Sequence, residues 1–301
     1  MASCESQNSR LVLGTAQLGM RYGLTNKAGR PGTLESESIV AKVWQCGIRE
    51  FDTAQAYGDS ELVLGRILNS LGLTHKAKII SKFHPEIDHR SSSCLRRALE
   101  QTLTRLGQDK LYGMMLHGED FLEHWDTGLG KTLNEFVEKN LVERIGISVY
   151  KPQSAIRALR SKGITLVQIP SNLLDRRFEE AGVLHEAEDC GKQIYVRSVF
   201  LQGLLLLNPG DLPQSMQFAI PVIERLVSLS KKTGLSQKQM ALGYVKASYP
   251  GQKVVFGCET AQQADENIKI WKMELPGSVI EQIKSEFRNI PEKILNPSYW
   301  T

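Results

Sequence analysis

Paired cysteines, long apolar runs and clustered basic residues are all missing from this chain of 301 residues. No apolar run approaches the ~20 residues of a membrane-spanning helix, and the first ten residues lack the basic-then-apolar pattern of a secretory signal. The cysteines are odd in number and none is spaced as CxxC, which argues against a disulfide framework or a zinc site. We therefore expect a cytoplasmic protein with no membrane contact and no bound metal. The five cysteines are Cys4, Cys46, Cys94, Cys190 and Cys258.

The charged residues are nearly balanced and scattered along the chain. Lysine and arginine total 37 against 33 aspartate and glutamate, which gives a formal charge of +4. Without a basic cluster we expect no nucleic-acid partner, although a mildly basic surface attracts a phosphate-bearing cofactor. Hydrophobic residues make up 41% of the chain, which is typical of a globular protein with a large core.

Short apolar runs alternate with longer stretches of helical spacing, and this alternation predicts parallel strands joined by helices. Leu95, Leu99 and Leu106, for example, fall on one helical face. Lys151 followed by Pro152 marks a helix start, and Asp59 offers a capping side chain at another. The runs that we interpret as strands are 11–13, 48–51, 78–80, 111–116, 144–147, 165–169, 193–196 and 253–256.

Eight strand–helix units favour a closed barrel over an open sheet, so the fold class that we predict is α/β, a (β/α)8 TIM barrel. A doubly wound open sheet is the alternative, but no GxGxxG follows a strand, which weakens the dinucleotide-binding version of it. No linker or repeat divides the chain. We expect residues 1–301 to form a single domain, with the barrel at about 10–270 and a C-terminal helix and tail at 271–301.

Polar side chains follow the apolar runs, at the end of a barrel where active sites lie. Asp52, Lys82 and His117 follow three consecutive predicted strands, and Tyr57 lies on the loop five residues after Asp52. Each of them alone is more often structural than catalytic, but together they point to chemistry at one barrel mouth. The other polar residues in such positions are Ser81, Ser148, Gln168, Asn172, Arg197 and Ser198.

These four side chains fit the reduction of a carbonyl group. A tyrosine has a pKa near 10, and an ammonium about 4 Å away favours the phenolate by roughly 4 kcal/mol at an effective dielectric near 20. We therefore expect Lys82 to lower the pKa of Tyr57 and to make it a better proton donor. Asp52 would keep Lys82 charged, and His117 would orient the carbonyl oxygen. The hydride must come from a bound nicotinamide, because no side chain supplies one.

The same residues lie in motifs that resemble those of the aldo-keto reductases. Residues 14–19 read GTAQLG and residues 51–58 read FDTAQAYG. Ser81-Lys82, Leu116-His117 and the run 146–148 (GIS) follow in the family's order, and the resemblance extends over about 10–270. It implies a barrel that binds NADP(H) and reduces an aldehyde or ketone, with Tyr57 as general acid in a tetrad with Asp52, Lys82 and His117.

The resemblance also implies where the cofactor binds. Gln168 and Ser148 would hold the nicotinamide carboxamide, Arg197 falls where the family stacks an aromatic ring on the nicotinamide, and Ser198 would meet the phosphates. The residues that would line the adenosine end are Gly257, Cys258, Gln263, Glu266 and Asn267.

Three positions depart from the family pattern. Val149 replaces an asparagine that contacts the carboxamide, and Arg197 replaces the aromatic residue. A guanidinium can stack on a ring, but its charge opposes the cationic oxidised nicotinamide, so we expect Arg197 to favour the reduced cofactor. Gly257 and Gln263 stand where many members carry the lysine and arginine that bind the 2′-phosphate. NADP(H) remains the favoured cofactor, because cations from other loops can bind the 2′-phosphate; Lys253 and Arg197 are cations near these positions in the sequence. NAD(H) remains an alternative.

Two other functions fit parts of the pattern. Lys82 could form a Schiff base in a lyase, but it would have to be neutral, and Asp52 opposes that. A non-catalytic sensor that binds the nucleotide is the second alternative, although all four tetrad side chains are present. For the reductase we expect a small-molecule carbonyl substrate and a monomer or small homo-oligomer. Aromatic residues that could wall the substrate pocket are Tyr22, Trp125, Phe200, Tyr299 and Trp300.

Overall fold

A computed structural model describes residues 8–300, so Cys4 lies outside the described part. Eight parallel strands form a closed barrel in chain order, and β1 pairs with both β2 and β8. This closure confirms the predicted barrel, and the open sheet is wrong. The strands are β1 (Leu11–Gly14), β2 (Glu50–Asp52), β3 (Lys78–Lys82), β4 (Gly113–Leu116), β5 (Ile145–Ser148), β6 (Ile164–Pro170), β7 (Gln193–Arg197) and β8 (Lys253–Phe256).

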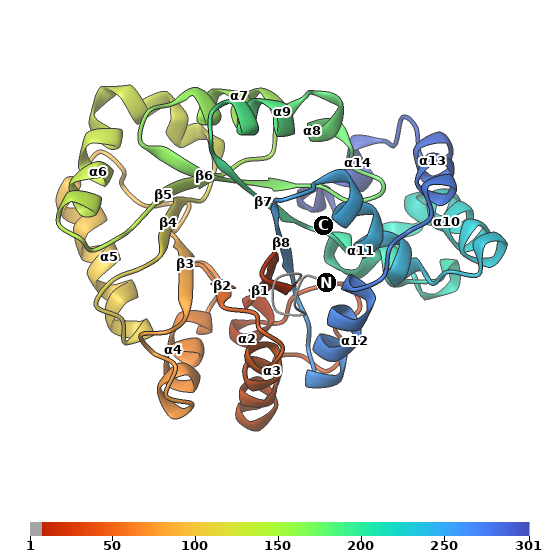
Figure 1. Cartoon of the computed structure of the whole chain (residues 1–301), viewed down its shortest axis with the longest axis horizontal. Helices are drawn as coiled ribbons and strands as arrows, with labels where there is room; N and C mark the ends of the chain where they lie inside the picture. Colours follow the sequence, from red (N-terminus) through yellow and green to blue (C-terminus); the bar gives the residue numbers. More distant parts are fainter. Residues whose placement is uncertain (1–7, 301) are drawn as a thin grey trace, which may run out of the picture.

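Helices cover the outside of the strands (Figure 1). The connection after β7 is long and holds two α-helices together with shorter helical turns. The longer helices in the described residues are α3 (Thr33–Gln45), α4 (Ser60–Ser70), α5 (Ser92–Leu106), α6 (Gly130–Glu138), α7 (Pro152–Arg160), α10 (Ile220–Thr233), α11 (Gln237–Ser248), α12 (Ala261–Trp271) and α13 (Gly277–Glu286). The shorter segments are α2 (Ala16–Gly19), α8 (Arg177–Glu180), α9 (Val183–Asp189), α14 (Glu292–Leu295), η1 (Glu119–His124), η2 (Trp125–Leu129), η3 (Leu201–Leu206), η4 (Pro209–Asp211), η5 (Gln214–Ala219) and η6 (Pro297–Tyr299).

Local sequence sets several helix ends. The Ser91 hydroxyl accepts a hydrogen bond from the Cys94 N–H at the start of α5, and Gly107 ends that helix in the left-handed conformation. Pro152 begins α7, as predicted. The expected Asp59 cap of α4 is wrong: its backbone (φ −85°, ψ 7°) is not the extended form of a capping residue, and its carboxylate pairs with Arg30 at 2.7 Å instead.

Two hydrophobic layers hold the barrel together. A small cluster fills its interior, where one side chain in two along each strand points. A much larger cluster lies between the strands and the helices, and it includes Leu95, Leu99 and Leu106 of α5. The interior cluster consists of Val12, Ile80, Met115, Leu166, Tyr195 and Val255. Because this interior is packed, the chemistry is confined to the ends of the barrel.

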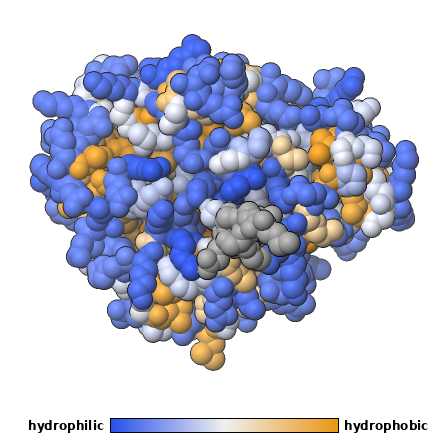
Figure 2. Space-filling model, viewed as in Figure 1, coloured by the Kyte–Doolittle hydropathy of each residue, from blue (hydrophilic) through white to orange (hydrophobic). Residues whose placement is uncertain are grey.

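The surface carries only scattered hydrophobic side chains. The face in Figure 2 is mostly hydrophilic, with hydrophobic residues dispersed over it. The large hydrophobic side chains that are exposed are Met20, Leu34, Tyr150, Met273 and Tyr299. Among the described residues, the helices are all too short or too polar to cross a bilayer.

Candidate active site

The four tetrad side chains predicted from the sequence come together at the C-terminal end of the barrel. Asp52 is the last residue of β2, Lys82 is the last residue of β3, and His117 directly follows β4. Tyr57 lies on the short loop between β2 and α4. The loop folds back because the Tyr57 N–H bonds to the Ala54 carbonyl at 3.0 Å.

Two glycines fix the loop that carries Tyr57. Gly58 has a φ of +56°, a left-handed conformation that strains other residues. A Cβ on Gly19 in α2 would lie 1.9 Å from the Tyr57 carbonyl oxygen, so only glycine lets α2 pack against this loop. These contacts explain physically why the two glycines belong to the motifs around 14–19 and 51–58.

Lys82 and Asp52 form a buried ion pair below Tyr57. The Lys82 Nζ lies 2.7 Å from Asp52 Oδ2 and also donates to the Thr53 carbonyl at 2.9 Å. Lys82 is fully buried, and Asp52 is 4% exposed. Burial lowers the pKa of Lys82, and the neighbouring Asp52 carboxylate opposes that change. The pair thus holds a cation below the ring of Tyr57, 5.1 Å from the ring centroid.

The environment of Tyr57 differs from the sequence expectation. We expected Lys82 to lower the tyrosine's pKa, but burial and the Asp52 carboxylate raise the pKa of Tyr57 well above its usual value. Burial is the largest cause because it removes water from the charged phenolate, and the nearby Asp52 carboxylate adds to the increase. Arg197 is the cation that lowers the pKa of Tyr57, although its effect is smaller than that of burial. Tyr57 is therefore a phenol that keeps its proton.

His117 lies beside Tyr57, with the two rings edge to face and their centroids 5.8 Å apart. Burial, together with the charges of Lys82 and Arg197, lowers the pKa of His117 to about 3. The imidazole is thus neutral at physiological pH, and its Nδ1 is buried without a hydrogen-bond partner. A neutral imidazole can donate one hydrogen bond to a substrate oxygen without adding charge.

Gln168, Ser148 and Arg197 surround the same mouth, from the ends of β6, β5 and β7. The Gln168 Nε2 donates to Asp52 Oδ1 at 2.8 Å, while its Oε1 is buried with no partner. Arg197 donates from Nε to the Ser148 hydroxyl at 3.3 Å and from Nη1 to the Ser198 hydroxyl at 3.2 Å. Its guanidinium carbon lies 4.4 Å from the centroid of the Tyr150 ring, and its Nη2 is buried and unpartnered.

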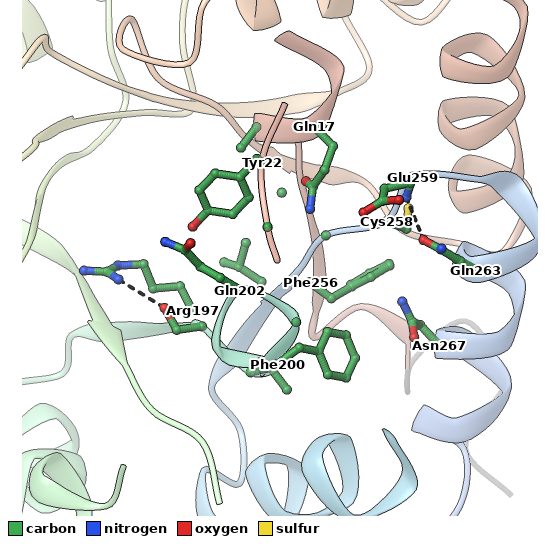
Figure 3. A pocket seen from close by; sticks show the side chains of 18 of the residues that line it. Gln17, Tyr22, Arg197, Phe200, Gln202, Phe256, Cys258, Glu259, Gln263 and Asn267 are labelled. Carbon is green, nitrogen blue, oxygen red and sulfur yellow. Dashed lines mark hydrogen bonds between the residues drawn. The ribbon is translucent and has the colours of Figure 1, made fainter. Parts of the chain in front are cut away.

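A cleft runs from this mouth to the start of α12, and Figure 3 shows it from close by. Asp52, Tyr57 and Arg197 line one part of it. The remaining lining residues include the expected Tyr22, Ser198, Phe200, Gly257, Cys258, Gln263 and Asn267. Burial raises the pKa of the Cys258 thiol to about 12, which is the behaviour of an inert buried cysteine.

Other predicted residues do not line the cleft. Four of them belong to the tetrad or the nicotinamide end but are not in the cleft wall: Lys82, His117, Ser148 and Gln168. Glu266 is also absent from the wall, and it pairs with Lys238 at 3.0 Å. Trp125 is buried, with its ring nitrogen bonded to the Lys162 carbonyl. Tyr299 and Trp300 do not line the cleft either, and the Trp300 ring nitrogen donates to the Lys293 carbonyl.

Lys253 is wrong as a candidate for binding the cofactor phosphate. It is the first residue of β8, so it lies at the N-terminal end of the barrel, away from the cleft. Its amine pairs with the Glu50 carboxylate at 2.6 Å. Strand polarity alone could have excluded it, because the N-terminal residue of a barrel strand lies at the opposite end from the active site.

Six polar residues that line the cleft were missed as site residues by the sequence reasoning: Thr15, Gln17, Thr25, Gln202, Lys238 and Glu259. Gln17 belongs to the 14–19 motif after β1, which was a usable signal, whereas Gln202, Lys238 and Glu259 lie in a helical turn, a helix start and a loop that carry no motif. Among residues 8–300, no group of three or more His, Cys, Asp and Glu side chains is arranged to hold a metal ion.

The geometry fits a nicotinamide dinucleotide. Three buried polar atoms without partners belong to Gln168, which lies beside the cleft, and to Arg197 and Asn267, which line it: Gln168 Oε1, Arg197 Nη2 and Asn267 Oδ1. A buried polar atom that lacks a partner is costly, and these three suit an amide N–H, a phosphate oxygen and an adenine amino group.

Comparisons with known proteins identify the family to which this chain is similar. The model of the Aldo/keto reductase family matches residues 10–286. The chain is 25% identical over 218 residues to a protein of Schizosaccharomyces pombe named probable pyridoxal reductase 2, with 65% of each chain covered, just under two thirds of that protein's length. It is 26% identical over 289 residues to the chloroplastic pyridoxal reductase of Arabidopsis thaliana, covering 81% of this chain and 76% of that one. The chain is also 26% identical to an uncharacterized oxidoreductase of Bacillus subtilis, and the alignment covers 93% of this chain and 92% of that protein.

Solved structures show the same fold. The holo form of an aldo-keto reductase from Bacillus halodurans superposes with a TM-score of 0.75 at 18% identity, covering 97% of this chain and 95% of that one. A glycerol dehydrogenase from Gluconobacter oxydans gives the same TM-score and identity, covering 94% and 93%.

Proposed function

Because the chain belongs to the aldo/keto reductase family, we propose that it is an NAD(P)H-dependent oxidoreductase that reduces an aldehyde or ketone to an alcohol, with Tyr57 as general acid. The family consists of oxidoreductases that use nicotinamide cofactors on small carbonyl compounds. The observation that carries the proposal is the position of the Tyr57 ring, which lies next to the buried Lys82–Asp52 pair and edge to face with neutral His117.

The residues divide the work of the reaction. A bound nicotinamide supplies the hydride to the carbonyl carbon. The Tyr57 hydroxyl donates its proton to the carbonyl oxygen, and Lys82 stabilises the phenolate that remains. His117, held neutral by its low pKa, donates a hydrogen bond to the same oxygen. Asp52 accepts from both Lys82 and Gln168, and so fixes the cation and the amide that would hold the carboxamide.

The Schiff-base alternative is less well supported. Lys82 is fully buried and its amine donates to Asp52 and to the Thr53 carbonyl, so the amine is charged and occupied rather than free to attack a substrate carbonyl. The cytoplasmic location, the single domain and the monomeric or small homo-oligomeric state stay predictions, and one relative is a chloroplastic protein.

Purified protein titrated with NADPH and NADH, and then assayed with a panel of carbonyls, tests the proposal. Pyridoxal belongs in the panel because two relatives are named pyridoxal reductases. We expect saturable cofactor binding and turnover of at least one carbonyl, and Tyr57→Phe should lower kcat by roughly 10²-fold or more with cofactor Kd nearly unchanged. Cofactor binding without turnover of any carbonyl would favour the non-catalytic sensor.

A further inference from the structure

Three charged side chains lie where the cleft meets α11 and α12. Lys238, near the start of α11, and Glu259, in the loop before α12, line the cleft. Glu266 of α12 does not line it, but its Oε2 lies 3.0 Å from the Lys238 Nζ. The charges of these three side chains sum to −1, because Glu259 and Glu266 contribute −1 each and Lys238 contributes +1.

An unsatisfied amide lies in the same part of the cleft. Asn267 is 3% exposed and lines the cleft, and its Oδ1 has no hydrogen-bond partner. A free carbonyl oxygen there accepts from an amino group, such as the exocyclic amine of adenine. The Gln263 oxygen is already used, because it accepts the Glu259 N–H at 2.8 Å, and this bond holds the backbone of Glu259 (Figure 3).

Glu259 is the charged group in this part of the cleft that has no counterion. Within residues 8–300, Lys238 is paired with Glu266 and no ion pair involves Glu259. Burial alone raises the pKa of Glu259, without a cation beside it to lower it. A carboxylate in this state accepts hydrogen bonds from hydroxyl groups and repels other anions.

The cleft carries no cation at residue 257, which is a glycine. A Cβ on Gly257 would lie 2.5 Å from the Gln17 amide nitrogen, so a lysine there would require the end of the Gln17 side chain to move. A phosphate monoester carries about −1.5 to −2 near pH 7, and it would face Glu259 and a lysine whose charge Glu266 already offsets.

We propose that this chain selects NAD(H) over NADP(H), with the Glu259 carboxylate accepting hydrogen bonds from the ribose hydroxyls of the adenosine half. An acidic side chain on the 2′-hydroxyl is the general means by which proteins favour NAD, whereas a cation favours the 2′-phosphate. The inference rests on the proposed function and runs opposite to the preference for NADP(H) expected from the sequence.

Direct binding tests the inference without any substrate. The full chain is titrated with NADH and with NADPH, and the nicotinamide fluorescence gives a Kd for each. NADH should bind at least about tenfold more tightly, the factor that one charge-assisted hydrogen bond gives. Glu259→Gln should reduce the ratio of the NADPH Kd to the NADH Kd by about tenfold, because it weakens the hydrogen bonds to NADH and removes the repulsion of NADPH. Glu100→Gln, an exposed residue of α5 outside the cleft, is the matched control and should leave both Kd values unchanged.

A double variant separates this inference from its rival, in which Lys238 binds the 2′-phosphate. Lys238→Met with Glu266→Gln removes the ion pair without changing the net charge. We expect the ratio of the NADPH Kd to the NADH Kd to change less than about threefold. A tenfold loss of affinity confined to NADPH would assign the 2′-phosphate to Lys238 and overturn the inference. Tighter binding of NADPH than NADH by the wild type would also overturn it and leave the proposed function intact. If neither cofactor binds, both fail.

Discussion

The amine of Lys82 lies 2.7 Å from the carboxylate of Asp52, and the protein encloses both groups almost completely. Each charge is tolerable in this place only because the other is present, since a single buried charge is strongly destabilising. Burial raises the pKa of Tyr57 most, and the Asp52 carboxylate of the pair adds to that increase. The site therefore holds a protonated tyrosine whose ring centroid lies 5.1 Å from the Lys82 amine.

Lys82→Met tests the mutual dependence of the two charges. The variant leaves Asp52 buried without its cation, so we expect the free energy of unfolding to fall by about 3 kcal/mol or more, measured by urea denaturation at pH 7. The control is Lys82→Met combined with Asp52→Asn, which removes both charges and should recover much of the loss. Equal stabilities of the single and double variants would contradict the pairing argument.

Gln168 offers a test of the carboxamide contact. Its buried Oε1 lacks a partner, so it should accept the amide N–H of the nicotinamide carboxamide. The 3-acetylpyridine analogue of the cofactor replaces that amide nitrogen by a methyl group, and the wild type should bind it roughly tenfold more weakly than the natural cofactor. Gln168→Leu should bind the two forms about equally. A variant that discriminates between them as well as the wild type does would show that the contact lies elsewhere.

Arg197→Tyr addresses the redox form of the cofactor. The Arg197 guanidinium lies in the cleft without a carboxylate partner among residues 8–300, and it opposes the positive charge of an oxidised nicotinamide. The ratio of the Kd for the oxidised form to the Kd for the reduced form should fall by about tenfold in the variant. Calorimetric titration with both forms measures it. Tyr150, on which the guanidinium stacks, provides the control, because Tyr150→Leu keeps the charge and should preserve the ratio.

His117 should make stability depend on pH in acid. Its pKa of about 3 lies below the value near 6.5 of an unfolded histidine. Between these values the unfolded chain binds a proton that the folded chain does not, so stability falls as the pH falls from 6.5 towards 3. His117→Gln lacks this effect, and its stability relative to the wild type should rise steadily from pH 7 to pH 4.5 in urea denaturation. Parallel stability curves over that range would mean that His117 is protonated in the folded protein.

The local sequence was enough to predict the barrel and the end at which its chemistry lies. The spacing of the apolar residues, and the breaks between the apolar runs, identified the eight strands. Side-chain spacing along a strand or helix is a local property of the sequence. The residues that follow these runs lie at the same end of the barrel, so the sequence alone predicted that Asp52, Lys82 and His117 lie close together. Gly19 and Gly58 could be recognised as motif residues, but the packing of α2 on the Tyr57 loop that requires them could not.

Only the tertiary structure decided which charges neutralise one another. Lys253 and Lys238 look alike in the sequence, yet one lies at the far end of the barrel against Glu50 and the other lines the cleft beside Glu266. The raised pKa of Tyr57 and the unpaired Glu259 depend on burial and on partners that are distant in sequence. Electrostatic energies depend on the distances between charges and on their burial in the folded chain. The local sequence therefore predicted the fold and the candidate reacting groups, whereas the tertiary structure decided their pKa values and the charges near the proposed cofactor.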